Sequence, residues 1–131
     1  MVRMGEITSR PATILLVEDD TLTRTALVFL LTTAGYQVLE ASDGVEGVEC
    51  FTQQPGAIDL VVSDLFMPRM DGLEMLQALQ AYAPQVKLIL LTGAPPKERA
   101  WRAQGVQDWL SKSLAPEQLL NKVAAALADC P

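Results

Sequence analysis

The chain has 131 residues, which is enough for one domain with a single hydrophobic core. Half of its residues are apolar, a fraction typical of globular proteins with buried strands and unlike that of disordered chains. The net charge of −6 disfavours direct nucleic-acid binding, and the absence of histidine excludes a phosphohistidine carrier, a His-based catalytic triad and a His-containing metal site.

The start of the chain contains no recognisable targeting signal. Residues 1–12 have no apolar run that resembles a signal sequence, and no stretch of the chain approaches the roughly 18 apolar residues of a membrane span. We therefore expect a soluble, cytoplasmic protein without a membrane partner, in which Cys50 and Cys130 are reduced thiols. We also expect residues 1–12 to form a flexible N-terminal extension and residues 13–129 to form one domain.

Beyond this extension, apolar runs alternate with segments of helical spacing. Strands are predicted at Ile14–Val17, Tyr36–Ala41, Leu60–Val62, Leu88–Leu91 and Trp109–Ser111. Helices are predicted at Thr21–Ala34, from Val45 to near Pro55, at Gly72–Tyr82, from Pro95 to Gln104, and from Pro116 onward. The alternation predicts an α/β fold, a doubly wound parallel sheet with helices on both faces.

The first and last helices have apolar stripes that can be assigned to particular residues. The first has apolar residues at helical spacing, namely Leu22, Ala26, Leu27, Leu30, Leu31 and Ala34. The last is predicted to bury Leu119, Leu120, Val123, Ala124 and Leu127. Elsewhere, we interpret Met75 and Trp101 as surface or packing residues, and Asp20 and Asp71 as residues that begin helices.

Polar side chains follow four of the predicted strands. Glu18 and Asp19 follow the first strand, Asp64 the third, Thr92 the fourth and Lys112 the fifth. Because ligands of an open parallel sheet bind beyond the carboxyl ends of its strands, we expect these groups to converge. Two carboxylates about 4 Å apart repel by about 4 kcal/mol at an effective dielectric constant near 20, so three acids require cations nearby. Lys112 and a divalent ion would neutralise them, and oxygen ligands with room for water favour Mg²⁺.

The same residues could support phosphoryl transfer. A carboxylate such as Asp64 can attack phosphorus and form an aspartyl phosphate. The reaction depends mainly on alignment and on neutralisation of the three equatorial phosphoryl oxygens. Mg²⁺ would hold one oxygen, the Lys112 ammonium a second, and the Thr92 hydroxyl with nearby backbone amides the third.

Taken together, these stretches resemble the receiver domain of bacterial two-component response regulators. The matching segments are residues 14–20, 59–72, 89–93 and 108–112, which together span nearly the whole domain. The resemblance implies a flavodoxin-like (βα)5 three-layer sandwich with strand order 2-1-3-4-5. It also implies site roles: Asp64 as phosphoacceptor, Asp19 as direct metal ligand, Glu18 through metal-bound water, Phe66 through its backbone carbonyl, Lys112 at the phosphoryl group, and Thr92 and Trp109 as switch residues.

The resemblance further implies a signalling switch rather than an enzyme. A sensor histidine kinase or histidine phosphotransfer protein would donate the phosphoryl group in a Mg²⁺-dependent reaction, and the output face would then change. The donor is expected to dock near Leu22, Thr23 and Ala26 of the first helix. No effector domain is recognisable after the final helix, so we expect either a stand-alone receiver or one excised from a larger regulator or hybrid kinase. The cognate kinase and the downstream target are not predicted.

Three features depart from the family pattern. The lysine of receiver domains is usually followed by a cis proline, but Ser113 follows Lys112 in this chain. Because a cis bond to serine costs about 3 kcal/mol, we predict a trans bond and a slightly rearranged Lys112 loop. The segment 92–105 is short, which predicts a short fourth helix. Phe66 and Ala94 stand where polar side chains are common, and apolar groups cannot position an attacking water, so we expect slow self-dephosphorylation.

Other interpretations stay open at this point. A pseudo-receiver that binds partners without being phosphorylated is compatible with Ser113. A haloacid-dehalogenase-like phosphatase would need an Asp-x-Asp motif after its first strand, which Glu18-Asp19-Asp20 does not provide. A flavodoxin would need a phosphate-binding loop rich in Ser, Thr and Gly after that strand, and the chain has none there. Trp109 could also simply fill the core.

Overall fold

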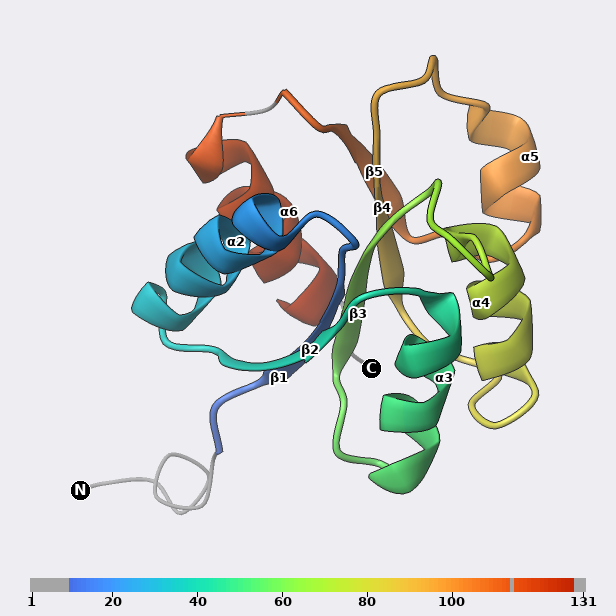
Figure 1. The fold of residues 1–131 in the computed structure, drawn as a ribbon, viewed down its shortest axis with the longest axis horizontal. Coiled ribbons are helices and arrows are strands. Elements are labelled where there is room, and N and C mark those ends of the chain that lie inside the picture. Colours follow the sequence, from blue (N-terminus) through green and yellow to red (C-terminus); the bar gives the residue numbers. More distant parts are fainter. Residues whose placement is uncertain (1–9, 114, 129–131) are drawn as a thin grey trace.

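The computed structural model describes residues 10–113 and 115–128, in which five strands alternate with five helices (Figure 1). The strands are β1 (Thr13–Val17), β2 (Gln37–Ala41), β3 (Leu60–Asp64), β4 (Leu88–Thr92) and β5 (Asp108–Ser111). The helices are α2 (Thr21–Thr33), α3 (Gly44–Gln53), α4 (Gly72–Gln80), α5 (Glu98–Ala103) and α6 (Pro116–Ala128). Within the described residues, no helix is both long and apolar enough to cross a bilayer.

All strand pairs are parallel and the order is β2-β1-β3-β4-β5, which confirms the predicted fold class and topology. The register places particular residues side by side. Val17 of β1 pairs with Ser63 of β3, so the next residues, Glu18 and Asp64, lie at neighbouring strand ends. Thr92 pairs with Ser111, which brings the end of β4 next to the start of the Lys112 loop. The carboxyl edge of the sheet therefore gathers the polar residues.

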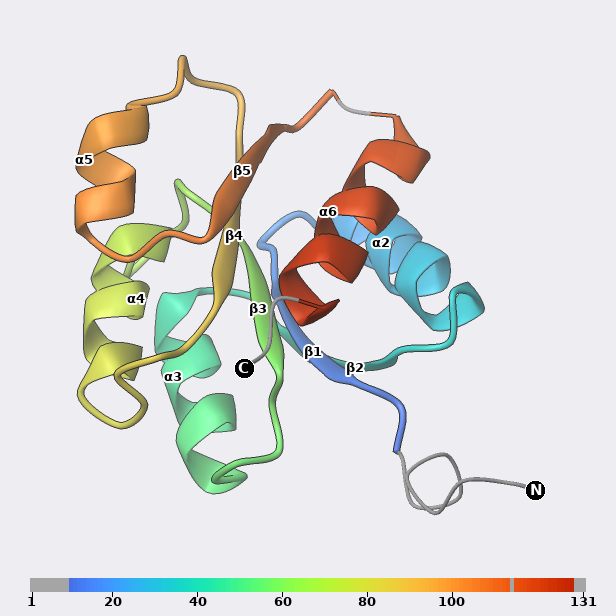
Figure 2. The same ribbon diagram turned by 180° about the vertical axis from the view of Figure 1, so that it is seen from behind.

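Helices cover both faces of the sheet and divide its core into two halves. Helices α2 and α6 lie on one face, and α3, α4 and α5 lie on the other (Figures 1 and 2). The period of two along β1 sends Leu15 and Val17 into the half beneath α3, α4 and α5, and Ile14 and Leu16 into the half beneath α2 and α6. β1 is thus buried on both faces, as its continuous apolar run predicts.

Aspartates begin three of the helices. The Asp20 side chain accepts a hydrogen bond from the Thr23 amide at 2.8 Å, and Asp43 accepts one from the Glu46 amide at 2.9 Å. Asp71 caps α4 in a reciprocal capping box with the residue three positions later. The interpretation of Asp20 and Asp71 as helix-start residues is therefore confirmed.

Only part of each apolar stripe of α2 and α6 is buried, and in α6 this differs from the prediction. Leu22 is 82% exposed and Ala26 and Ala34 are also exposed, whereas Leu31 is fully buried. In α6, Ala126 is buried and Ala124 is exposed, so the prediction for Ala124 is wrong. Helix α6 buries only the narrow stripe of Leu119, Val123 and Ala126, at i, i+4 and i+7, and α2 buries only Leu31, so the residues beside these positions are half-buried or exposed.

Several predicted boundaries also shift. Helix α4 ends at Gln80 rather than Tyr82, and α5 covers only Glu98–Ala103, which confirms that the fourth helix is short. Val38 and Leu39 are half-buried because β2 is an edge strand.

Of the predicted N-terminal extension, only residues 10–12 are described, and Arg10 pairs with Asp59 at 3.0 Å. Residues 1–9, Cys130 and the predicted domain end at residue 129 lie outside the described residues.

We predict that Gly72→Ala lowers the free energy of unfolding by about 1–3 kcal/mol, as overpacking of a close contact does. A Cβ atom at Gly72 would fall against the backbone carbonyl oxygen of Asp64, which cannot move without displacing the strand. Urea unfolding followed by circular dichroism measures the loss. Gly93→Ala is the control, because no atom lies within 4 Å of its added Cβ; equal stability of the two variants would contradict the prediction.

Candidate functional site

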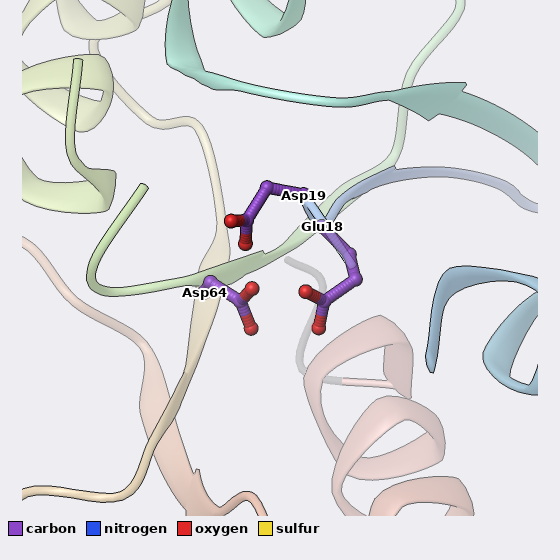
Figure 3. Close-up of side chains that lie close together, drawn as sticks. All are labelled: Glu18, Asp19 and Asp64. Carbon is purple, nitrogen blue, oxygen red and sulfur yellow. The ribbon is translucent and has the colours of Figure 1, made fainter. Parts of the chain in front are cut away.

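Three carboxylates converge at the carboxyl edge of the sheet. Glu18, Asp19 and Asp64 each offer one carboxylate oxygen, and these oxygens lie within 4.8 Å of one another. The three side chains point toward a common space in Figure 3. Glu18 is 0% and Asp64 is 1% exposed, whereas Asp19 is exposed. The cluster thus has a buried floor and an open side.

Lys112 supplies a positive charge to this cluster. Its Nζ lies 3.1 Å from Asp64 Oδ1 and 3.3 Å from Glu18 Oε1. The Lys112 backbone amide donates to the Thr92 carbonyl oxygen at 3.0 Å, which fixes the start of the loop against β4. The bond from Lys112 to Ser113 is trans, and the Ser113 amide donates to Ser111 Oγ at 3.3 Å. Serine in place of the usual proline therefore leaves the lysine within reach of both acids.

The buried carboxylate oxygens lack hydrogen-bond donors. Glu18 Oε2 accepts from the Asp20 amide at 3.0 Å, but Glu18 Oε1 and both carboxylate oxygens of Asp64 have no hydrogen-bonding partner. Lys112 is close enough to Glu18 Oε1 and Asp64 Oδ1 for ion pairs, without donating to them in good hydrogen-bond geometry. Orphaned buried acceptors are rare in proteins, and three of them around one open space fit a hard cation with oxygen ligands. The residues present therefore suit Mg²⁺.

The protein groups alone favour one shared proton in this site. Burial contributes most to raising the pKa of Asp64 to about 8, and the adjacent Glu18 carboxyl adds to the rise, although Lys112 opposes it. Burial would raise the pKa of Glu18 as well, but the adjacent Asp64 carboxyl, the hydrogen bond from the Asp20 amide and Lys112 together lower it overall. Burial works against the charge of Lys112, yet the two acids raise its pKa. A cation in the site would displace the proton from Asp64.

The other predicted site residues lie at different distances from the cluster. Thr92 is buried at the end of β4, and its Oγ1 accepts from the Ala94 amide at 3.0 Å. The Phe66 side chain is 69% exposed and points away from the protein core, so only its backbone could serve the site. Trp109 is half-buried outside the carboxylate cluster, edge-to-face with Trp101 at 5.8 Å between ring centroids.

Three arginines that contact residues far away in the sequence or in neighbouring elements were not singled out by the sequence analysis. Arg24 donates to the Glu18 backbone carbonyl at 2.7 Å and so braces the strand end from α2. Arg102 stacks over the Trp109 ring at 4.8 Å from its centroid. Arg69 Nε lies 2.7 Å from Asp43 Oδ2. The sequence offers only one indication of their importance, which is that each arginine lies in the loop or helix that follows a strand.

Comparisons with known proteins agree on one family. The family model of the response regulator receiver domain matches residues 14–124. Sensor kinase CckA of Brucella abortus is 44% identical over 85 residues, which cover 65% of this chain and 9% of that protein. Transcriptional regulatory protein GlrR of Escherichia coli is 36% identical over 120 residues, or 90% of this chain and 27% of that protein. The chain therefore spans less than a third of the length of either relative.

A solved structure shares the fold across almost the whole chain. The receiver domain of sensor histidine kinase PA1611 from Pseudomonas aeruginosa superposes with a TM-score of 0.81 at 26% identity. The match covers 92% of this chain and 100% of that structure. That structure is described as having a magnesium ion coordinated in its active site cleft.

We predict that Asp64→Asn raises the Tm measured in EDTA, and that the gain grows as the pH rises from 5 to 8. The pKa of Asp64 is about 8 in the fold and about 3.9 in the unfolded chain, so the folded state binds more protons between these values. Stability contributed by Asp64 therefore falls as the pH rises through this window. A gain of several degrees is expected, since about 1 kcal/mol moves Tm by about 4 °C in a domain of this size.

The control is Asp108→Asn, which removes an acid paired with Lys122 at 2.9 Å outside the carboxylate cluster. Differential scanning calorimetry at several pH values measures all three proteins. A gain for Asp64→Asn that stays constant with pH would show that Asp64 is ionised in the fold throughout this range.

Proposed function

Because this chain belongs to the response regulator receiver domain family, a family of signalling modules rather than true enzymes, we propose that it is a phosphoacceptor switch of a two-component system. It takes a phosphoryl group onto Asp64 from a histidine kinase or a histidine phosphotransfer protein in a Mg²⁺-dependent reaction. The observation that carries this proposal is the buried Asp64 carboxylate, whose oxygens lack hydrogen-bond donors while Lys112 lies 3.1 Å away. The proposed receiver domain is residues 13–129, in the cytoplasm.

In the proposed reaction, an ionised oxygen of Asp64 attacks the phosphorus of the donor phosphohistidine. A new P–O bond forms as the donor's P–N bond breaks, and the electron pair of that bond returns to the donor imidazole, which takes up a proton. The raised pKa of Asp64 means that the acid must first lose its own proton. The Lys112 ammonium, already beside Asp64, can then bind a phosphoryl oxygen.

Glu18, Asp19, Asp64 and the backbone carbonyl of Phe66 would hold Mg²⁺, with Glu18 acting mainly through bound water. The orphaned oxygens of Glu18 and Asp64 support this assignment, as does the magnesium in the PA1611 receiver structure. When bound, Mg²⁺ supplies positive charge that neutralises the acids and the phosphoryl group. Lys112 and the ion together balance the three carboxylates.

Thr92 and Trp109 would carry the change to the output face. The Thr92 hydroxyl accepts from the Ala94 amide in this structure, and it can rotate to donate to a phosphoryl oxygen. Trp109 lies on β5, next to β4, where it packs between Trp101 and Arg102. The apolar side chains of Phe66 and Ala94 support slow loss of the phosphoryl group, because neither can position water.

The pseudo-receiver alternative depended on displacement of Lys112 by Ser113. The ion pairs from Lys112 to Asp64 and Glu18 weigh against that displacement. No observation favours the pseudo-receiver over the phosphoacceptor.

Incubation with acetyl phosphate and Mg²⁺ should add one phosphoryl group to the intact protein. Mass spectrometry measures the adduct, and its decay after removal of the donor gives its lifetime. The adduct should be absent from Asp64→Asn and from wild-type protein in EDTA. No adduct under conditions where Mg²⁺ demonstrably binds would overturn the proposed function.

The donor should dock on the exposed apolar residues of α2 beside Lys112. Leu22 is 82% and Phe29 is 73% exposed. Phe29 lines a groove of about 310 Å³ between α2 and the Lys112 loop, and Leu22 precedes the lining residue Thr23 on the same helix; the full lining is Thr23, Ala26, Leu27, Phe29, Leu30, Leu91, Lys112 and Pro116. Its position next to the acceptor site gives a docked phosphohistidine access to Asp64.

We predict that the double variant Leu22→Ala, Phe29→Ala lowers kcat/KM for transfer from a histidine kinase that phosphorylates the wild type by about tenfold or more, a cost typical of exposed apolar anchors. Phosphorylation by acetyl phosphate should not change, because this small donor needs no docking surface. Tyr82→Ala is the control, since Tyr82 is 66% exposed at the opposite edge of the sheet. An equal loss with both donors would place the defect in the acceptor site instead.

A further inference from the structure

The loop between β3 and α4, residues 65–71, directly follows the acceptor Asp64 and is held at both ends. The Gly72 amide donates to the Leu65 carbonyl oxygen at 2.8 Å, which closes the base of the loop. Gly72 also lies so close to the Asp64 carbonyl that a Cβ atom would not fit there. Phe66, whose backbone is a proposed metal ligand, therefore sits in a loop of restricted conformation.

The tip of this loop is fastened to a different part of the chain. Arg69 Nε lies 2.7 Å from Asp43 Oδ2, and Arg69 Nη2 donates to Asp43 Oδ1 at 3.2 Å. Asp43 is 8% exposed, and it also caps α3 by accepting from the Glu46 amide. The guanidinium of Arg69 contributes most to holding the pKa of Asp43 below its usual value. One aspartate thus fixes both the start of α3 and the tip of the loop.

Two further observations describe the backbone at the loop tip. Arg69 has φ 66°, in the left-handed region that residues other than glycine rarely adopt, so the surrounding contacts must compensate for its cost. A Cβ atom at Gly44 would meet the Met70 carbonyl oxygen at 2.5 Å, so the loop backbone lies directly against the first turn of α3. The glycine allows the approach and the Asp43–Arg69 pair fastens it.

We propose that the Asp43–Arg69 pair is a positioning device for the metal and phosphoryl site, because it holds residues 65–71 in the conformation that Mg²⁺ binding requires. This inference rests on the proposed function in one respect, namely that the site takes Mg²⁺. Neither residue touches the reacting atoms. Both act through the backbone that follows Asp64, as outer-shell partners orient the ligands of other metal sites.

Simple electrostatics makes the opposite prediction for Arg69. Removing one positive charge from the protein should leave the binding of a cation unchanged or strengthen it, because any repulsion between Arg69 and the cation is lost. If Arg69 positions the loop, its removal should weaken the binding. The sign of the change therefore separates the two explanations.

The test is a Mg²⁺ titration of the full chain, followed by the amide resonances of residues 65–67 and 69–72 in ¹H–¹⁵N spectra. Arg69→Ala should weaken Mg²⁺ binding about tenfold, at the lower end of the effect of outer-shell partners. Asp43→Asn should weaken it similarly while retaining the helix cap, since asparagine caps as well as aspartate. The double variant should bind no more weakly than the weaker single variant, as expected when two residues act through one contact.

Two more variants complete the design. Arg69→Gly removes the guanidinium but suits the left-handed backbone, so it should also bind Mg²⁺ weakly if the side-chain contact matters. Arg10→Ala is the matched control, because it breaks an Arg–Asp pair with Asp59 at the other edge of the sheet and should leave Mg²⁺ affinity unchanged. Arg69→Lys should restore only part of the affinity, because lysine lacks the planar fork.

Unchanged or tighter Mg²⁺ binding by Arg69→Ala would overturn the proposal. Wild-type affinity of Arg69→Gly would overturn it too, since the backbone conformation alone would then suffice. These outcomes are independent of phosphorylation, which the acetyl phosphate experiment tests on the wild type. A wild-type protein that binds Mg²⁺ but takes no phosphoryl group would refute the proposed function and leave the positioning role of Arg69 standing.

Discussion

Two carboxylates buried side by side, Glu18 and Asp64, impose the main physical constraint on this molecule. Each is almost fully removed from water, and one ammonium, that of Lys112, lies within ion-pair distance of both. A single cation cannot balance the pair together with the nearby Asp19, so the site retains a proton or takes up a second cation. This imbalance favours the uptake of a further cation at the site.

Such a costly site needs a rigid frame, and the sheet provides it. β1 and β3 are fully buried, and their register leaves no freedom in the relative positions of Glu18 and Asp64. Apolar cores on both faces of the sheet hold these strands in place. The strands therefore cannot move apart to relieve the repulsion between the acids. The site favours bound cations for this reason.

The loops around the site make different contacts. The loop after β5 brings Lys112 to the acids, and the loop after β3 is fastened to α3 through Arg69 and Asp43. On the far side of β4, Trp109 packs against Trp101 and beneath Arg102, and the three side chains form a compact cluster. Thr92 lies at the end of β4, the one strand that separates Asp64 on β3 from Trp109 on β5.

The sequence by itself determined the fold class, the five strands and the acids at their ends, because these features depend on local patterns of apolar residues and on the rule that parallel strands gather their carboxyl ends. It also indicated Asp20 and Asp71 as helix caps, since capping is a local interaction. Only the tertiary structure decided which stripe of α6 is buried, because the sheet accepts Ala126 and leaves Ala124 in solvent. It likewise decided the contacts that join distant segments. Whether Lys112 reaches Asp64, and whether Arg69 meets Asp43, depends on loop conformation and strand order, which no local pattern encodes.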